Sequence, residues 1–194
     1  MTMLIYLHGF RSSPQSFKSE LLEQYCARHN ISDRYACPQL PVSPARAIQV
    51  VRDQYTLTPQ DTLVGSSLGG YYATWLAEAT GCRAVLINPA VNPARDLAPY
   101  VGPLRTYHDD QPMELLAEHI QELADFSVNA ITFPERYFLI AAKGDEVLDW
   151  REMVAQYPGV QTVLREGSDH GLSEFDEHID QVIEFAGIKP GRHV

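Results

Sequence analysis

The sequence predicts an α/β protein with a mostly parallel sheet of about six strands and helices on both faces. Six short apolar runs read as strands, and most are continuous rather than alternating, as in parallel strands covered on both faces. Helical patterns lie between the runs, and such a strand–helix alternation builds a parallel sheet. With 194 residues, we expect one domain over 1–194. The runs span residues 3–7, 34–37, 62–64, 84–88, 136–142 and 160–165.

Capping and stop signals delimit the predicted helices. Ser13-Pro14 and Ser43-Pro44 each place a capping residue before a proline at the first helical position. The first of these helices has an apolar stripe, and we expect that stripe to be buried. The stripe consists of Phe17, Leu21, Leu22 and Tyr25. Three further helices are expected: one from residue 67 that stops before Gly81, one near 149–157, and one from Ser173 to Gly187.

Residues 89–135 interrupt the alternation. This segment holds six prolines and one helical pattern, near 113–124, and it is too long for a plain crossover. We expect a small cap inserted over the carboxyl ends of the strands, where ligands bind in open α/β sheets. The alternative is a long structural crossover.

The most informative motif is Gly-Ser-Ser-Leu-Gly at residues 65–69, between an apolar run and a helical pattern. Gly-x-Ser-x-Gly in that context is typical of the nucleophile elbow of the α/β-hydrolase fold. The glycines remove Cβ atoms where strand and helix come close. The turn lifts the Ser67 hydroxyl above the sheet and leaves the first helical N–H groups free. We therefore predict the α/β-hydrolase fold with Ser67 as nucleophile; the alternative is an ordinary tight turn with a capping serine.

A serine nucleophile needs a base, and chain order places the acid and then the histidine after the serine. His170 lies in a glycine-flanked loop between the last apolar run and the last helix, which predicts that it is the base. Asp145 follows the end of the run 136–142 and is predicted to orient that histidine. The remaining alternatives for the carboxylate are Glu146, Asp149 and Asp169, of which Asp149 is better placed as a helix cap.

An acyl-transfer intermediate also needs two oxyanion donors. One is expected to be the backbone N–H of Leu68, the residue after the nucleophile. The other should come from the loop after the first strand, where we choose the amide of Phe10; His8 is expected to orient this loop by hydrogen bonding. Arg11 in the same loop is interpreted as a solvated arginine rather than as a ligand for an anionic substrate group.

The composition of the chain indicates which binding partners, cofactors and cellular location to expect. The formal charge of −10 disfavours nucleic acid and anionic membranes as partners. Three cysteines without paired spacing indicate free thiols rather than disulfides or a zinc site, so we expect no metal and no cofactor. No run is long enough to span a membrane and no signal peptide is recognised, so a cytoplasmic location is predicted. The oligomeric state stays open.

Six motifs are spread along the chain from the first strand onward. They are Tyr6-Leu7-His8-Gly9-Phe10, Ser12-Ser13-Pro14, Pro38-Gln39-Leu40-Pro41, the block from Gly65 to Leu76, Asn88-Pro89-Ala90-Val91, and the block from Gly144 to Asp149. Together these motifs resemble the YqiA-like esterases of bacteria, and the resemblance runs from the first strand to the last helix. The histidine motif departs from the family, since Asp169-His170-Gly171 stands here for its Asn-His-Ala. The resemblance implies a small α/β-hydrolase that acts on carboxylic esters, with a triad on Ser67, Asp145 and His170.

The sequence therefore predicts a serine esterase whose substrate is a small-molecule acyl ester or thioester. The same machinery would serve an acyl-CoA thioesterase or a peptidase, and the sequence does not separate them. An alternative of another class is a non-catalytic binding protein on a hydrolase scaffold.

Overall fold

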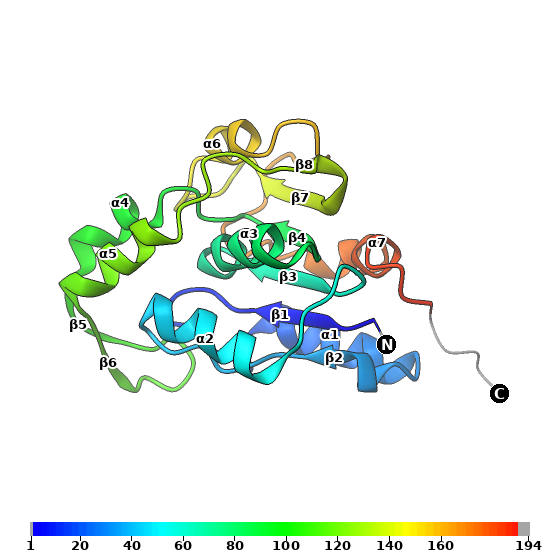
Figure 1. Ribbon diagram of the computed structural model, residues 1–194, viewed down its shortest axis with the longest axis horizontal. Helices are drawn as coiled ribbons and strands as arrows, with labels where there is room; N and C mark the ends of the chain where they lie inside the picture. Colours follow the sequence, from blue (N-terminus) through cyan, green and yellow to red (C-terminus); the bar gives the residue numbers. More distant parts are fainter. Residues whose placement is uncertain (1, 190–194) are drawn as a thin grey trace.

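A computed structural model describes residues 2–189 and is built around a six-stranded sheet in the order β2-β1-β3-β4-β7-β8 (Figure 1). Every neighbouring pair of strands is parallel. The predicted fold class and all six predicted strands are confirmed, with each strand end within two residues of its expected position. The strands are β1 (Leu4–Leu7), β2 (Tyr35–Ala36), β3 (Thr62–Ser66), β4 (Arg83–Ile87), β7 (Tyr137–Ala142) and β8 (Gln161–Arg165).

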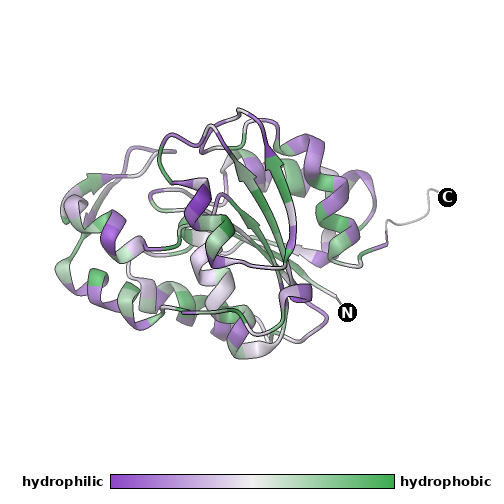
Figure 2. Ribbon diagram, turned by 90° about the horizontal axis from the view of Figure 1, so that it is seen from above, coloured by the Kyte–Doolittle hydropathy of each residue, from purple (hydrophilic) through white to green (hydrophobic). Residues whose placement is uncertain are grey.

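Helices cover both faces of this sheet (Figure 1). Alternate side chains of a strand point to opposite faces, so Leu4 and Tyr6 belong to the core beneath α1 and α7. Ile5 and Leu7 belong to the core beneath α2, α3 and α6. Figure 2 shows the central strands as strongly hydrophobic and the helices as mixed. These helices are α1 (Phe17–Arg28), α2 (Pro44–Gln54), α3 (Leu68–Thr80), α6 (Trp150–Gln156) and α7 (Ile179–Phe185).

Three of the predicted helix boundaries are confirmed by their caps. The Ser43 hydroxyl accepts a hydrogen bond from the Arg46 amide at the start of α2. Asp149 caps α6 in the same way, as expected from its position. Gly81 ends α3 in the left-handed conformation, with φ of 80°.

Two other helix starts were predicted wrongly. Helix α1 begins at Phe17 rather than after Ser13, because the Ser13 carbonyl accepts the Ser16 amide at 3.0 Å and closes a turn first. Phe17 is consequently 53% exposed instead of part of the buried stripe. At the C-terminal end, a short 3-10 helix, η4 (Phe175–His178), precedes α7 where a helix from Ser173 was expected.

The segment 89–135 lies beyond the carboxyl ends of the sheet strands (Figure 1). The predicted helix 113–124 is wrong over its first residues, because these pair as a strand with an earlier part of the same segment; Arg105 lies opposite Pro112. The segment contains α4 (Pro93–Leu97), the 3-10 helix η2 (Ala98–Tyr100), β5 (Gly102–Arg105), β6 (Pro112–Leu115) and α5 (Ala117–Asp125), and a 3-10 helix, η3 (Pro134–Arg136), lies at its end. A further 3-10 helix, η1 (Ser32–Arg34), lies outside the segment and precedes β2.

The three cysteines, Cys26, Cys37 and Cys82, are free thiols. Over residues 2–189, no helix combines the length and the apolar character needed to cross a membrane.

Candidate active site

Ser67 is the single residue between β3 and α3, at the carboxyl edge of the sheet. Its backbone has φ of 53° and ψ of −120°, a left-handed conformation that side chains rarely adopt. The surrounding backbone fixes this conformation. The Ser67 amide donates to the Ile87 carbonyl at 3.0 Å, and its carbonyl accepts from the amides of Gly70 and Ala90 at 3.0 Å each. The strained serine is therefore held in place by the neighbouring strand and by its own helix.

The two motif glycines allow three backbone segments to meet at this turn. A Cβ on Gly65 would overlap the carbonyl of Gly69, and a Cβ on Gly69 would overlap the carbonyl of Leu7 at the end of β1. Backbone atoms of sheet and helix cannot move aside as a flexible side chain could. The absence of both Cβ atoms is thus a condition for the approach of β1, β3 and α3.

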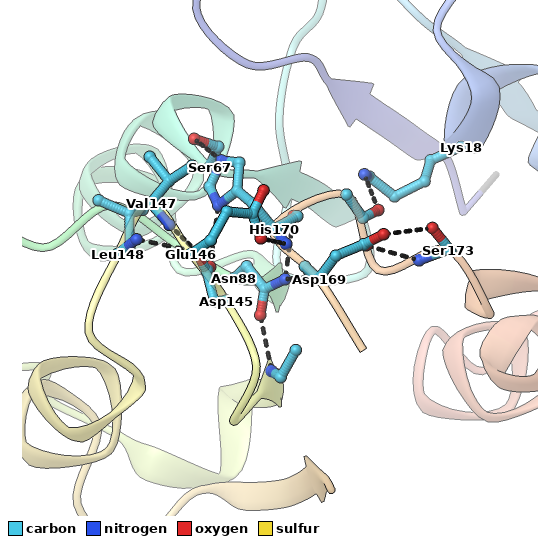
Figure 3. A network of polar contacts seen from close by, with 12 residues as sticks. Lys18, Ser67, Asn88, Asp145, Glu146, Val147, Leu148, Asp169, His170 and Ser173 are labelled. Atoms are coloured by element: carbon cyan, nitrogen blue, oxygen red, sulfur yellow. Dashed lines mark hydrogen bonds and ion pairs between the residues drawn. The ribbon is translucent and has the colours of Figure 1, made fainter. Parts of the chain in front are cut away.

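The structure brings the Ser67 hydroxyl next to the imidazole of His170 and places Asp145 behind it (Figure 3). The distance from His170 Nε2 to Ser67 Oγ is 3.0 Å. On the other side of the ring, His170 Nδ1 lies 2.8 Å from Asp145 Oδ2. Three residues from separate parts of the chain thus form a continuous chain of hydrogen bonds.

Asp145 is oriented by its own loop. Its Oδ1 accepts hydrogen bonds from the amides of Val147 and Leu148, each at 2.8 Å. The other oxygen, Oδ2, therefore faces His170. The Asp145 side chain is fully buried, whereas that of His170 is 22% exposed. A buried carboxylate acceptor at Nδ1 fixes the imidazole tautomer with its proton there, which leaves Nε2 free to accept from Ser67.

The alternative carboxylates make other bonds. Asp169 does not fold back onto the His170 ring, because it accepts from the amide and hydroxyl of Ser173. Glu146 accepts from the backbone amide of His170 at 2.9 Å and so holds the loop rather than the ring. Asp149 is used as the cap of α6.

Asn88 is a buried residue that the sequence analysis did not select for a role. Its side-chain amide donates to the carbonyls of Asp169 and His170, each at 3.0 Å, and its oxygen accepts from the Ala142 amide at 2.8 Å. The side chain is completely buried. Asn88 thereby connects the ends of β4 and β7 to the loop 166–174 between β8 and η4, which contains His170 and is called the histidine loop below. The signal that could have found it is a polar side chain directly after a continuous apolar run.

The two expected oxyanion donors belong to segments next to Ser67. The Leu68 amide begins α3, and Phe10 belongs to the loop after β1, in which a Cβ on Gly9 would lie 3.3 Å from Ser67 Cβ. Within residues 2–189, neither the Phe10 nor the Leu68 amide donates to another protein atom. Both amides therefore have a free donor, as the predicted role requires.

His8 holds the Phe10 loop, as the sequence analysis expected. Its Nε2 accepts from the Leu40 amide at 3.0 Å, and its Nδ1 lies 3.0 Å from the Gly9 carbonyl. Burial lowers the pKa of His8, which favours the neutral ring. A neutral ring that accepts at Nε2 must carry its proton on Nδ1, so both bonds are satisfied together.

A cavity of about 570 Å³ opens at this site. Ser67, His170 and Phe10 line it, and the segment 89–135 contributes apolar side chains opposite them, among them Leu97 and Tyr100. A mostly apolar cavity with polar groups at defined positions is typical of sites that bind small organic molecules.

Arg11 links the Phe10 loop to the segment 89–135. Its Nε donates to the Arg105 carbonyl at 2.5 Å, and its guanidinium carbon lies 4.1 Å from the centre of the Tyr107 ring. The Tyr107 amide in turn donates to the Arg11 carbonyl at 2.8 Å. The interpretation of Arg11 as a solvated arginine is therefore wrong: its side chain is bound on both sides to the β5–β6 hairpin.

The parallel sheet, together with a serine at the turn between β3 and α3, is the arrangement of the α/β-hydrolase fold. Solved structures of that class superpose on most of the chain. A protein of Agrobacterium vitis assigned as a hydrolase has a TM-score of 0.71 at 18% identity and covers 95% of this chain and 87% of its own. The esterase domain of a Rhodothermus marinus protein has a TM-score of 0.61 at 19% identity, with 96% and 84% covered. At these identities the likeness shows the fold.

The chain belongs to the UPF0227 family, described as "Uncharacterised protein family (UPF0227)", whose model matches residues 3–187. The UPF0227 protein YcfP of Salmonella paratyphi B is 26% identical over 200 residues, which cover 94% of this chain and 98% of that protein. The resemblance to the YqiA-like proteins is thereby confirmed at the level of the family.

The backbone of Ser67 makes a specific stability prediction. We expect Ser67→Gly to be more stable than Ser67→Ala by about 1 kcal/mol, because only glycine is unstrained at this φ and ψ. Urea unfolding of the two variants measures the difference. The same pair of substitutions at exposed Ser32, which is not among the positive-φ residues, should give the opposite order. Equal midpoints at Ser67 would show that the turn stores no strain.

Asn88→Ala is expected to loosen the histidine loop. The substitution leaves the carbonyls of Asp169 and His170 and the amide of Ala142 without partners, which should lower the free energy of unfolding by about 2–3 kcal/mol. Hydrogen exchange of residues 167–172 should become faster. Asn129→Ala, at an exposed asparagine, is the matched control. Unchanged exchange in Asn88→Ala would contradict the role given to this side chain.

Proposed function

We propose that this protein is a serine hydrolase that cleaves carboxylic esters through an acyl-enzyme. The observation that carries the proposal is the chain of hydrogen bonds from Asp145 through His170 to Ser67. A serine hydroxyl is a weak nucleophile until a neighbouring base accepts its proton, and this arrangement supplies that base. Structural neighbours that are hydrolases and esterases support the same reaction class.

In the first half of the reaction, Ser67 Oγ attacks the ester carbonyl while His170 Nε2 takes its proton. Asp145 stabilises the imidazolium that forms, and the amides of Phe10 and Leu68 bind the negative oxygen of the tetrahedral intermediate. The bond from the carbonyl carbon to the alcohol oxygen then breaks. His170 returns the proton to the leaving alcohol, and the acyl group stays on Ser67.

In the second half, a water molecule takes the place of the alcohol. His170 accepts a proton from the water as its oxygen attacks the acyl carbon, and the same two amides bind the oxyanion again. The bond from carbon to Ser67 Oγ breaks and the proton returns to the serine. The products are one carboxylic acid and one alcohol, and the enzyme is restored.

We propose further that residues 89–135 act as a cap that shapes the acyl side of the cavity. Support comes from the lining residues that this segment supplies, such as Pro93, Leu97 and Tyr100. The same machinery would act on thioesters and anilides, because each presents an acyl carbonyl. Relative turnover on an ester, an acyl-CoA and an anilide with the same acyl group distinguishes these reactions.

Ser67→Ala should lower kcat for 4-nitrophenyl esters by about a thousandfold or more, because the attacking oxygen is removed. A fluorophosphonate probe should label the wild-type protein at Ser67 and leave the variant unlabelled. Ser32→Ala, at an exposed serine far along the chain from the site, should keep both properties. Ester hydrolysis at the wild-type rate in Ser67→Ala would overturn the proposal, as would a wild-type protein that neither turns over esters nor reacts with the probe.

Asp145→Asn tests how the base is oriented. The amides of Val147 and Leu148 require an acceptor at the position of Oδ1, so the new NH₂ group must face His170 Nδ1. The ring is then driven to carry its proton on Nε2, where it cannot accept from Ser67. We expect kcat to fall by about ten-thousandfold, as when a triad aspartate becomes asparagine. Asp53→Asn, at an exposed position on α2, is the control. A loss of less than tenfold would contradict this role for Asp145.

A further inference from the structure

The candidate active-site cavity has a polar region that the proposed reaction does not use. It is formed at the start of α1, where Ser16 and Lys18 line the same cavity as Ser67. In Figure 3, Lys18 approaches the histidine loop from the α1 side, away from Val147 and Leu148. A buried lysine in the lining of a cavity is unusual enough to require an explanation.

Lys18 is a buried ammonium without an ion-pair partner. Only 9% of its surface is exposed. Its Nζ donates one hydrogen bond, to the carbonyl of Gly171 at 2.5 Å. Among the residues that the structure describes, no carboxylate lies within ion-pair distance of it. Since an ammonium has three donors, two remain for other acceptors.

Ser16 presents a second unsatisfied group to the same cavity. Its Oγ is buried and forms no hydrogen bond of normal geometry, although it interacts with the hydroxyl of Tyr6, which lines the same cavity. As the N-cap of α1 it would normally accept from an amide of the first turn, but its side chain makes no such bond. A buried hydroxyl without a well-formed hydrogen bond costs free energy that a bound polar group would recover.

The charges that line the cavity favour an anion. Lys18 and Arg11 contribute two positive charges, and neither takes part in an ion pair within residues 2–189. Asp96 is the one carboxylate among these lining residues, and it pairs at 2.7 Å with Arg95, which also pairs with Glu152. The charges on the cavity lining that have no ion-pair partner are therefore positive, on a chain of net charge −10, while Asp169 and Asp145 lie near Lys18 without pairing with it. Such a contrast concentrates anionic ligands at the cavity.

Lys18 keeps most of its charge despite its burial. Burial lowers the pKa of Lys18 to about 8, and the nearby carboxylates of Asp169 and Asp145 oppose that change. At neutral pH the ammonium form therefore predominates.

We propose that Lys18 and Ser16 form a subsite for a carboxylate of the substrate, so that the enzyme prefers esters bearing a free carboxylate away from the scissile carbonyl. The inference rests on the proposed ester hydrolysis and adds the substrate class to it. Two free ammonium donors and one hydroxyl match the two oxygens of a carboxylate. A carboxylate would also supply the ion-pair partner that Lys18 lacks.

A purely structural role for Lys18 makes a different prediction. If its ammonium only holds the Gly171 carbonyl, its replacement disturbs His170 and lowers activity equally on neutral and anionic esters. If it binds a carboxylate, the loss is confined to anionic esters. The ratio of kcat/KM for an anionic ester to that for its neutral analogue separates the two roles.

The experiment compares wild type with Lys18→Gln, which removes the charge but retains a donor for Gly171. One series pairs monomethyl esters of dicarboxylic acids, from succinate to suberate, with methyl esters of monocarboxylic acids of equal length. A second series pairs 4-carboxyphenyl acetate with 4-methylphenyl acetate, which puts the carboxylate on the leaving group. We expect Lys18→Gln to lower the anionic-to-neutral ratio by about ten- to a hundredfold in one series, since hydrogen bonds to charged groups are among the stronger ones. That series identifies the side of the ester bond that carries the carboxylate.

Lys143→Gln is the matched control, because this lysine pairs with Glu166 outside the cavity; its ratio should equal that of wild type. Ser16→Ala should lower the ratio in the same series as Lys18→Gln, and by less. An unchanged ratio in both series for Lys18→Gln, with neutral esters still cleaved, overturns the subsite and leaves the proposed esterase intact. A wild-type protein that cleaves no ester in either series overturns the proposed function itself.

Discussion

The site depends on one steric constraint, the close approach of the end of β1 to the first turn of α3. A Cβ on Gly69 would overlap the carbonyl of Leu7, so this approach exists only because that position has no side chain. It sets Ser67 at the edge of the sheet, and it brings the loop after β1 against the Ser67 side chain. Ser67, Leu68 and Phe10 therefore line one cavity. His170 and the cavity-lining residues of the segment 89–135 are placed around this position of Ser67.

His170 lies in a loop without regular structure, yet its position is determined by hydrogen bonds to several other parts of the chain. The Glu146 carboxylate accepts from its amide, Asn88 donates to its carbonyl, and Lys18 donates to the next carbonyl along the chain. These partners come from the loop after β7, the end of β4 and the start of α1. The loop thus takes its rigidity from three separate parts of the fold. This explains how a residue 103 positions from Ser67 in sequence can be held at hydrogen-bonding distance from it.

Much of this architecture could be predicted from the sequence because its signals are local. Continuous apolar runs indicated the sheet strands, and chain order selected the serine, the aspartate and the histidine that the structure brings together. The parts that escaped prediction depend on distant partners. The strand at Pro112 exists only through pairing with Gly102–Arg105, and its residues otherwise continue a helical pattern. Asn88 and Lys18 were not selected because their partners are backbone carbonyls far along the chain, which no local pattern encodes.

The double connection between Arg11 and the β5–β6 hairpin makes two parts of the cavity mechanically dependent on each other. Tyr107 binds the Arg11 carbonyl, while the Arg11 side chain binds the Arg105 carbonyl, so the hairpin and the loop after β1 share their hydrogen bonds. The hairpin also lines the cavity through Tyr107. Consequently, a displacement of the hairpin also displaces the loop after β1, which contains Phe10. If the β5–β6 hairpin were replaced by the corresponding segment of a relative, residue 11 would have to be replaced together with it.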